Sequence, residues 1–229
     1  MSAIPDFERR QAKYAPVAQR LNELFGWPDW RPFLPPLDEL IDCILSQSTT
    51  DANRDRAFAA LKETFPTWRD VMDAPLSAVV AAIKPAGLAN QKAPRIQEIL
   101  RRIDAERGEL NIDFLADVPI EEAKAWLTSF YGVGPKTAAI VLCFAFQRPA
   151  FPVDTHIHRV GQRIGFLPQG ISADNAHPVM EAIIPPHDYF AFHLNLIRLG
   201  REICHARNPE CIICPLTQHC DYYQGLSSV

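Results

Sequence analysis

The segment from residue 130 to residue 138 reads Phe-Tyr-Gly-Val-Gly-Pro-Lys-Thr-Ala. It separates two segments with helical periodicity. Gly132 and Gly134 permit a tight, left-handed turn, and Pro135 suits the first position of the helix that follows. Free backbone N–H groups at the start of a helix can bind a phosphate group. The stretch therefore predicts either a plain corner between two helices or a corner that binds phosphate.

Lys136 favours a chemical role for this turn. An ammonium group in the first turn of a helix opposes the helix dipole. The same field, together with partial burial, lowers the pKa of a lysine and favours the neutral amine, which is the nucleophilic form. Lys136 is therefore a candidate nucleophile, and the alternative is a solvated lysine without a role.

Apolar residues recur at helical spacing along most of the chain. No segment shows the alternating pattern of a strand bounded by turn residues. We therefore expect an all-α protein with helices over residues 37–45, 53–64, 76–84, 96–103, 119–130, 135–146, 155–164, 173–183 and 187–200.

A second candidate residue lies at the start of one of these helices. Residues 151–156 read Phe-Pro-Val-Asp-Thr-His, which predicts Asp154 as the N-cap of the following helix. A carboxylate at a helix N-terminus stays ionised and can stabilise a cation that develops on a sugar ring. His156 and His158 lie two residues apart on different helix faces, so we do not expect them to bind a metal ion.

Composition sets the broad class. The chain has 229 residues, enough for one large or two small domains, and a net charge of −4, which is unusual for a general nucleic-acid binder. No apolar run reaches the roughly 20 residues of a membrane helix, and the first residues lack a signal-peptide pattern, so we expect a cytoplasmic protein. A local basic face is expected over residues 124–163, which hold five cations and one carboxylate: Lys124, Lys136, Arg148, Arg159, Arg163 and Asp154.

The six cysteines fall into two groups. Cys43 and Cys143 stand alone in apolar segments and are expected in the core. The other four, with the spacing Cys-x6-Cys-x2-Cys-x5-Cys, predict a metal site rather than disulfides: Cys204, Cys211, Cys214 and Cys220. Their spacing favours a [4Fe-4S] cluster, with zinc as the alternative, because zinc modules usually pair two Cys-x2-Cys arms.

The hairpin, the segment around Asp154 and the cysteine cluster closely resemble, in this order, those of endonuclease III and its helix-hairpin-helix glycosylase relatives. Asp154 follows Lys136 by 18 residues, and the resemblance runs from about Leu37 to Cys220. It implies a two-domain fold. A six-helix barrel with the helix-hairpin-helix occupies residues 30–148, and an iron–sulfur cluster domain combines residues 1–29 and 149–229.

The resemblance also implies a function. The family's bifunctional members act in base excision repair as DNA glycosylases and AP lyases, and they remove oxidised or ring-saturated pyrimidines through a lysine Schiff base and β-elimination. Lys136 takes the place of the catalytic lysine and Asp154 that of the catalytic aspartate. The expected partner is double-stranded DNA with damaged bases or abasic sites, bound by a monomer at the nucleoid of a bacterium or archaeon.

Two other functions remain open. A monofunctional mismatch or adenine glycosylase uses the same scaffold, but Lys136 argues against it. A non-catalytic helix-hairpin-helix DNA-binding protein is the second, and Lys136 and Asp154 together argue against it.

The resemblance further suggests DNA contacts. Residues 45–51 resemble the loop that fills the gap left by an extruded base, with Gln47 or Ser48 in that gap. Residues 86–90 resemble a wedge loop, with Leu88 either the apolar wedge or an ordinary packed leucine. Backbone phosphate contacts are expected at Gly132, Gly134 and Thr137. Between Cys204 and Cys211, where relatives usually carry several cations, Arg207 is the one clear cation, which predicts weaker DNA binding there.

Overall fold

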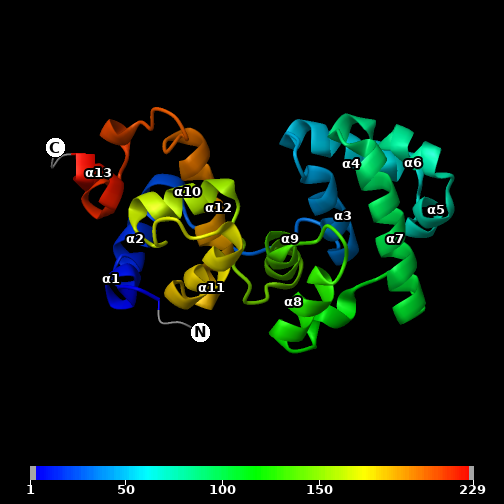
Figure 1. Cartoon of the computed structure of the whole chain (residues 1–229), viewed down its shortest axis with the longest axis horizontal. Coiled ribbons are helices and arrows are strands. Elements are labelled where there is room, and N and C mark those ends of the chain that lie inside the picture. Colours follow the sequence, from blue (N-terminus) through cyan, green and yellow to red (C-terminus); the bar gives the residue numbers. More distant parts are fainter. Residues whose placement is uncertain (1–3, 227–229) are drawn as a thin grey trace. The chain divides into compact units, whose positions relative to one another are not determined.

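The computed structural model describes residues 4–226, and within that range its regular elements are all helical. The fold-class prediction, all-α, is confirmed (Figure 1). The α-helices are α1 (Phe7–Ala12), α2 (Tyr14–Phe25), α3 (Pro36–Ser46), α4 (Asp51–Thr64), α5 (Trp68–Asp73), α6 (Leu76–Ala82), α7 (Ala89–Arg107), α8 (Ile120–Thr128), α9 (Pro135–Ile140), α10 (Thr155–Ile164), α11 (Ala173–Ile183), α12 (Tyr189–Glu202) and α13 (Asp221–Leu226). Short 3₁₀ helices are η1 (Lys84–Ala86), η2 (Asp113–Ala116), η4 (Pro186–Asp188), η5 (Cys211–Ile213) and η6 (Thr217–His219), and η3 (Val141–Ala145) is a π-helix.

The chain divides into two compact units, each with its own core. The central unit comprises residues 32–146 and contains α3 to α9. The terminal unit combines residues 4–31 with residues 147–226 and contains α1, α2 and α10 to α13. Both ends of the chain thus contribute to one unit.

The terminal unit is built around α12, which packs against α2 and α10. Phe192 on α12 is fully buried, and its ring lies 5.2 Å from Tyr14 and 5.9 Å from Phe166, centroid to centroid. A buried aromatic ring contributes a large apolar area to a core. Arg10 on α1 donates a hydrogen bond to the carbonyl of Gly165 at the end of α10 (2.7 Å), which fixes the N-terminal segment to the C-terminal helices.

In the central unit, α3 is the most buried helix, and α7 is the longest. Apolar residues of α3 recur at three- and four-residue spacing and are almost fully buried: Leu37, Leu40, Ile41, Ile44 and Leu45. Helix α7 ends at Gly108, whose φ of 76° suits a glycine C-cap. Helix α5 begins with a capping box between Thr67 and Asp70.

Several helix predictions are confirmed, two of them at the expected bounds. Helices α10 and α11 span residues 155–164 and 173–183 as predicted. The expected helix over 135–146 is α-helical only to Ile140 and then widens into the π-helix η3. No helix was expected where α1, α2, α5 and α13 lie. Within residues 4–226, none of the helices is long and apolar enough to cross a membrane.

Candidate functional site

The hairpin between α8 and α9 uses its two glycines differently. Gly132 has a φ of 82°, and a Cβ atom there would collide with the guanidinium group of Arg95. Gly134 is extended, with φ −93° and ψ −179°, and a Cβ atom there would meet open space. The left-handed conformation expected for this turn therefore occurs at Gly132 and not at Gly134, and only Gly132 requires glycine.

Lys136 is the second residue of α9, and it is exposed, whereas partial burial was expected. Helix α9 packs against α3. Burial raises the pKa of the Cys43 thiol on α3 well above its usual value, and the Lys136 charge acts in the opposite direction. Thr137 is buried, with 6% of its surface exposed, so its hydroxyl group is not available at the surface of the hairpin.

The side chain of Gln47 connects the loop after α3 to the hairpin. Its amide nitrogen donates to the carbonyl of Gly132 (3.0 Å), and its amide oxygen accepts from Arg95 (2.8 Å). Ser48, by contrast, is exposed and has a φ of 54°. Tyr131 is 75% exposed, and the Arg95 guanidinium lies 5.1 Å from the centre of its ring. Gln47 is thus bonded within the central unit, while Ser48 projects from it.

Leu88 stands immediately before α7 with a φ of 50°. Its surface is 50% exposed, which is unusual for a leucine that packs in a core. Gly87, at φ 67°, precedes it, so two consecutive residues have a positive φ. This conformation presents Leu88 at the surface of the central unit.

In the terminal unit, Asp154 is the N-cap of α10, as predicted. Its carboxylate accepts a hydrogen bond from the backbone N–H of Ile157 (2.7 Å). The three residues before it are buried, and two buried histidines hold their carbonyl groups. His177 Nδ1 lies 2.9 Å from the Phe151 carbonyl, and His193 Nδ1 lies 3.0 Å from the Pro152 carbonyl. Because a carbonyl only accepts, both Nδ1 atoms carry a proton, and the backbone leading to Asp154 is fixed.

The local basic face expected over residues 124–163 is reduced. Arg159 donates to the Gly200 carbonyl (2.8 Å) and to the Cys204 carbonyl (3.0 Å). Arg163 donates to the His205 carbonyl (2.7 Å) and to the Ala206 carbonyl (3.0 Å). Both arginines are half-buried. These two cations hold the chain at the first cysteine of the cluster and do not form part of a free basic surface.

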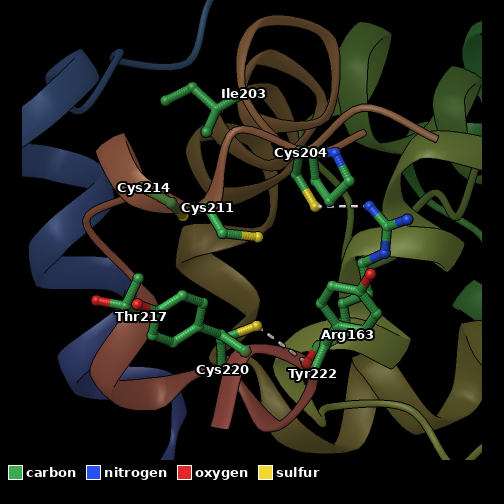
Figure 2. A pocket seen from close by; sticks show the side chains of 10 residues that line it. Arg163, Ile203, Cys204, Cys211, Cys214, Thr217, Cys220 and Tyr222 are labelled. Atoms are coloured by element: carbon green, nitrogen blue, oxygen red, sulfur yellow. Dashed lines mark hydrogen bonds between the residues drawn. The ribbon is translucent and has the colours of Figure 1, made fainter. Parts of the chain in front are cut away.

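The same segment carries the cysteine site. Cys204, Cys211, Cys214 and Cys220 line one cavity, and the sulfur atoms of Cys204, Cys211 and Cys220 face a shared opening (Figure 2). Arg163 donates to the Cys204 sulfur (3.3 Å), and the Cys220 thiol donates to the Arg163 carbonyl (3.2 Å). Among residues 4–226, no three His, Cys, Asp or Glu side chains converge tightly enough to hold a single metal ion.

Cys43 and Cys143 are buried, whereas the four clustered cysteines are half-buried, and burial affects the thiol pKa in both groups. Burial raises the pKa of Cys214 to about 11 and also raises that of Cys220, although backbone N–H groups act against it at both thiols. Cys43 and Cys143 are buried, and burial raises the pKa of Cys143 to about 12, so their predicted core position is confirmed. Arg207 is exposed on the loop between Cys204 and Cys211.

Two buried acids on α3 were not expected from the sequence. Glu39 and Asp42 are 6% and 8% exposed. Burial, reinforced by the charge of Asp42, raises the pKa of Glu39 to about 7. Burial also raises the pKa of Asp42 to about 6, although Arg54, 3.4 Å away, acts against it. Both lie on the side of α3 opposite its apolar stripe, together with Cys43 and Ser46.

Four further residues near the candidate site were not expected: Lys92, Arg95, His177 and His193. Each holds a carbonyl or an amide group that is distant in the sequence. A local sequence pattern contains no signal for such contacts.

Comparison with known sequences places the chain among DNA repair proteins. Residues 41–186 match the model of the HhH-GPD superfamily of base excision DNA repair proteins. Residues 204–220, which span the four cysteines, match the iron–sulfur binding domain of endonuclease III.

Individual relatives agree with these matches. A protein of Arabidopsis thaliana, named as a candidate DNA glycosylase, is 42% identical over 169 residues, which cover 73% of this chain and 57% of the plant protein. Endonuclease III of Thermotoga maritima is 33% identical over 189 residues, which cover 82% of this chain and 84% of that enzyme. A solved structure of endonuclease III trapped in a covalent intermediate with DNA superposes with a TM-score of 0.79 at 29% identity, and the alignment covers 96% of this chain and 98% of the other.

Proposed function

Since the chain belongs to the endonuclease III family within the HhH-GPD superfamily of base excision DNA repair proteins, we propose that this DNA glycosylase is bifunctional. It releases oxidised or ring-saturated pyrimidines from double-stranded DNA and then cuts the strand as an AP lyase. Lys136 is the observation that carries this proposal. It is an exposed amine next to the hairpin, in the part of the chain that the superfamily model covers. The trapped covalent complex of endonuclease III with DNA adds support from a relative.

In the proposed reaction, Lys136 is the nucleophile. Its neutral amine attacks the anomeric carbon of the damaged nucleotide, and the bond between that carbon and the base breaks. The base leaves with the electron pair of this bond and takes up a proton. The lysine nitrogen then gives up one proton, the bond between the anomeric carbon and the ring oxygen breaks as that oxygen takes up a proton, and a protonated Schiff base remains on the opened sugar. Removal of a proton from the neighbouring sugar carbon then expels the 3′ phosphate, which cuts the strand.

Asp154 stabilises the positive charge that develops on the sugar as the base departs. Its carboxylate is held by the Ile157 N–H group, and the backbone before it is buried. A charge that is already oriented needs no rearrangement when the transition state forms, which makes such stabilisation effective. Asp154 therefore acts on base release more than on cleavage of an existing abasic site.

Residues 204–220 match an iron–sulfur binding domain. We propose that this segment binds a [4Fe-4S] cluster through Cys204, Cys211, Cys214 and Cys220. The four cysteines line one cavity, and Arg163 donates a hydrogen bond to the Cys204 sulfur. Both features fit a cysteine-ligated group. When bound, the cluster supplies structural stability to a segment that has little regular structure of its own. The match to an iron–sulfur binding domain favours this cluster over zinc, which the cysteine spacing alone had left open.

The proposed DNA contacts follow from exposure. Ser48 faces the gap of the extruded base, because the amide of Gln47 is already bonded to Gly132 and Arg95. Leu88 is the wedge. At the hairpin, Gly132, Gly134 and the backbone N–H of Thr137 contact phosphate. Arg207 contacts the backbone through its exposed side chain. We propose a monomer that binds duplex DNA with damaged bases or abasic sites.

The test is a panel of duplexes that each carry one defined lesion, with base release and strand cleavage measured separately. Release of an oxidised or ring-saturated pyrimidine followed by strand cleavage at the same site supports the proposal. Release without cleavage identifies a monofunctional glycosylase. Binding to all duplexes without either reaction identifies a non-catalytic DNA-binding protein.

A further inference from the structure

Lys92, on the first turns of α7, is a fully enclosed lysine. Only 2% of its surface is exposed, and it is among the largest fully buried side chains in residues 4–226. Lysines are almost never buried unless their ammonium group has partners, because removing a charge from water is costly. Burial, and to a lesser degree the charge of Arg95, lowers the pKa of Lys92. The hydrogen-bond partners of this buried ammonium group therefore indicate its role.

Its two partners are carbonyls at the ends of two different helices. Lys92 Nζ donates to the carbonyl of Leu45 (2.8 Å), next to the last residue of α3, and to the carbonyl of Ala86 (2.9 Å), the last residue of η1. Carbonyls at the C-terminal end of a helix lack partners within the helix and carry a partial negative charge. One ammonium group thus satisfies and joins two helix ends that are far apart in the sequence.

The chain segments that follow these two carbonyls are the loops proposed to probe DNA. Leu45 leads into the gap-filling loop, where Ser48 has a φ of 54°. Ala86 leads into the wedge loop, where Leu88 has a φ of 50°. Non-glycine residues with a positive φ are strained, and they persist only where the surrounding structure holds them in place. Lys92 also donates from its backbone N–H to the Leu88 carbonyl (2.9 Å), so it holds the wedge loop on both sides of Gly87.

We infer that Lys92 is a positioning residue for base extrusion, because it fixes the gap-filling loop and the wedge loop relative to each other. The inference rests on the proposed function, since that proposal assigns these two loops to DNA. Ser48 and Leu88 then enter the duplex as one preorganised pair. Without the buried ammonium group, each loop samples other conformations, and extrusion of a paired base becomes slower.

The variant Lys92→Met keeps the apolar stem of the side chain and removes its donors. Gln97→Met is the matched control. Gln97 lies on the same helix, is 3% exposed, and donates to the carbonyls of Val71 (2.9 Å) and Ala74 (2.8 Å) at the end of α5. Both variants leave buried carbonyls without a donor, so both should lower Tm, but only Lys92 holds the two loops.

Single-turnover rates are measured on two probes: a duplex with one 5,6-dihydrouracil, which must be extruded, and the same duplex with a preformed abasic site. Lys92→Met should lower the dihydrouracil rate about 10- to 100-fold and the abasic-site rate much less, because a displacement of about 1 Å has effects of this size. Gln97→Met should change the two rates by the same factor. An equal loss on both probes for Lys92→Met, or the same selective loss for Gln97→Met, overturns the inference.

Hydrogen exchange in the absence of DNA provides a second measurement. In the wild-type protein, peptides covering residues 46–50 and 86–90 should be protected, and Lys92→Met should expose both together while Gln97→Met exposes neither. Unprotected loops in the wild type overturn the inference even where the Lys92 variant does not fold. If the wild type acts on neither probe, the proposed function fails, and exchange alone decides whether Lys92 fixes the loops.

Discussion

At the scale of single residues, Asp154 combines an observed structural role, the N-cap of α10, with the chemical role proposed for it. The cap bond to Ile157 orients its carboxylate, and buried histidines hold the two carbonyls at Phe151 and Pro152. The sequence predicted the cap because capping depends on neighbouring residues alone. It did not indicate His177 or His193, whose partners are 26 and 41 residues away.

We predict that Asp154→Asn separates the two reactions. Asparagine is also a good N-cap, so the variant should fold. It lacks the negative charge, so base release should fall by about 10²–10³, the usual effect of losing one electrostatic stabiliser. Cleavage of a preformed abasic site should fall less. Single-turnover rates on both substrates test this, and equal losses would show that the carboxylate serves both steps or the fold.

The buried acids Glu39 and Asp42 should make the free energy of unfolding depend on pH. Their pKa values rise on folding, to about 7 and about 6, so the folded state favours the protonated forms. Well below about pH 4 both groups are protonated in both states, and no penalty arises. The free energy of unfolding should therefore decrease as pH rises from about 4 to about 7 and then stay level with respect to these two groups.

The double variant Glu39→Gln and Asp42→Asn tests this dependence. The double variant has no ionisable group at these two positions, so its Tm should fall less between pH 5 and pH 7.5 than that of the wild type. Each kcal/mol of lost stability lowers Tm by about 2–4 °C. Asp38→Asn is the control, because Asp38 lies on the same helix and forms an ion pair with Lys62 (3.3 Å). The prediction is wrong if the Tm of the wild type rises with pH over this range and the double variant shows the same rise.

At the scale of elements, the hairpin between α8 and α9 is asymmetric. Gly132 is left-handed and sits against Arg95, which also bonds Gln47. Gly134 is extended and faces open space. The sequence showed that two glycines allow a turn, but it could not show which one the turn requires, because that depends on Arg95 from another helix.

We predict that the two glycines respond differently to substitution. Gly132→Ala should strain the turn, displace Arg95 and weaken binding to any duplex, whereas Gly134→Ala should leave Tm and binding close to the wild type. Gly134→Asp should lower affinity without unfolding the protein, because it sets a negative charge against phosphate. Duplex binding by fluorescence anisotropy together with Tm provides the test. Equal losses of affinity for the two alanine variants would show that the hairpin geometry does not control binding.

The predicted and missed elements differ in a physical way. Helices α10 and α11 have N-caps and periodic apolar faces, so their bounds could be predicted. Helices α1 and α5 have six residues each, too few for a periodic pattern to stand out. The buried position of Lys92 was unpredictable because a lysine on a helix is normally solvated, and its two carbonyl partners come from other elements.

At the scale of the whole molecule, the two ends of the chain stabilise the cysteine segment together. Lys13 donates to the carbonyl of His219 (2.7 Å) and to the carboxylate of Asp221 (2.8 Å), on either side of Cys220. Arg163 donates to the carbonyls of His205 and Ala206 and to the Cys204 sulfur. The spacing of the cysteines was visible in the sequence, but not that Lys13, near the N-terminus, bonds the residues on both sides of the last cysteine.

We predict that the purified protein is yellow-brown and contains about four iron atoms per chain, as a [4Fe-4S] cluster requires. Changing any one of the four clustered cysteines to Ala should reduce iron content and solubility, because a structural metal site contributes strongly to folding. Cys43→Ala and Cys143→Ala are the controls and should keep their iron. Iron analysis and absorption spectra measure this, and colourless protein that contains zinc would contradict it.

Borohydride trapping shows whether Lys136 forms a covalent bond with the damaged sugar. Wild-type protein mixed with a duplex that carries one abasic site should give a protein–DNA adduct when borohydride reduces the Schiff base, and peptide mapping should find the adduct on Lys136. Lys136→Gln should bind the duplex but give neither adduct nor strand cleavage, while Lys124→Gln, a control on the neighbouring helix α8, should trap like the wild type. Undiminished trapping by Lys136→Gln would show that another amine, and not Lys136, is the nucleophile.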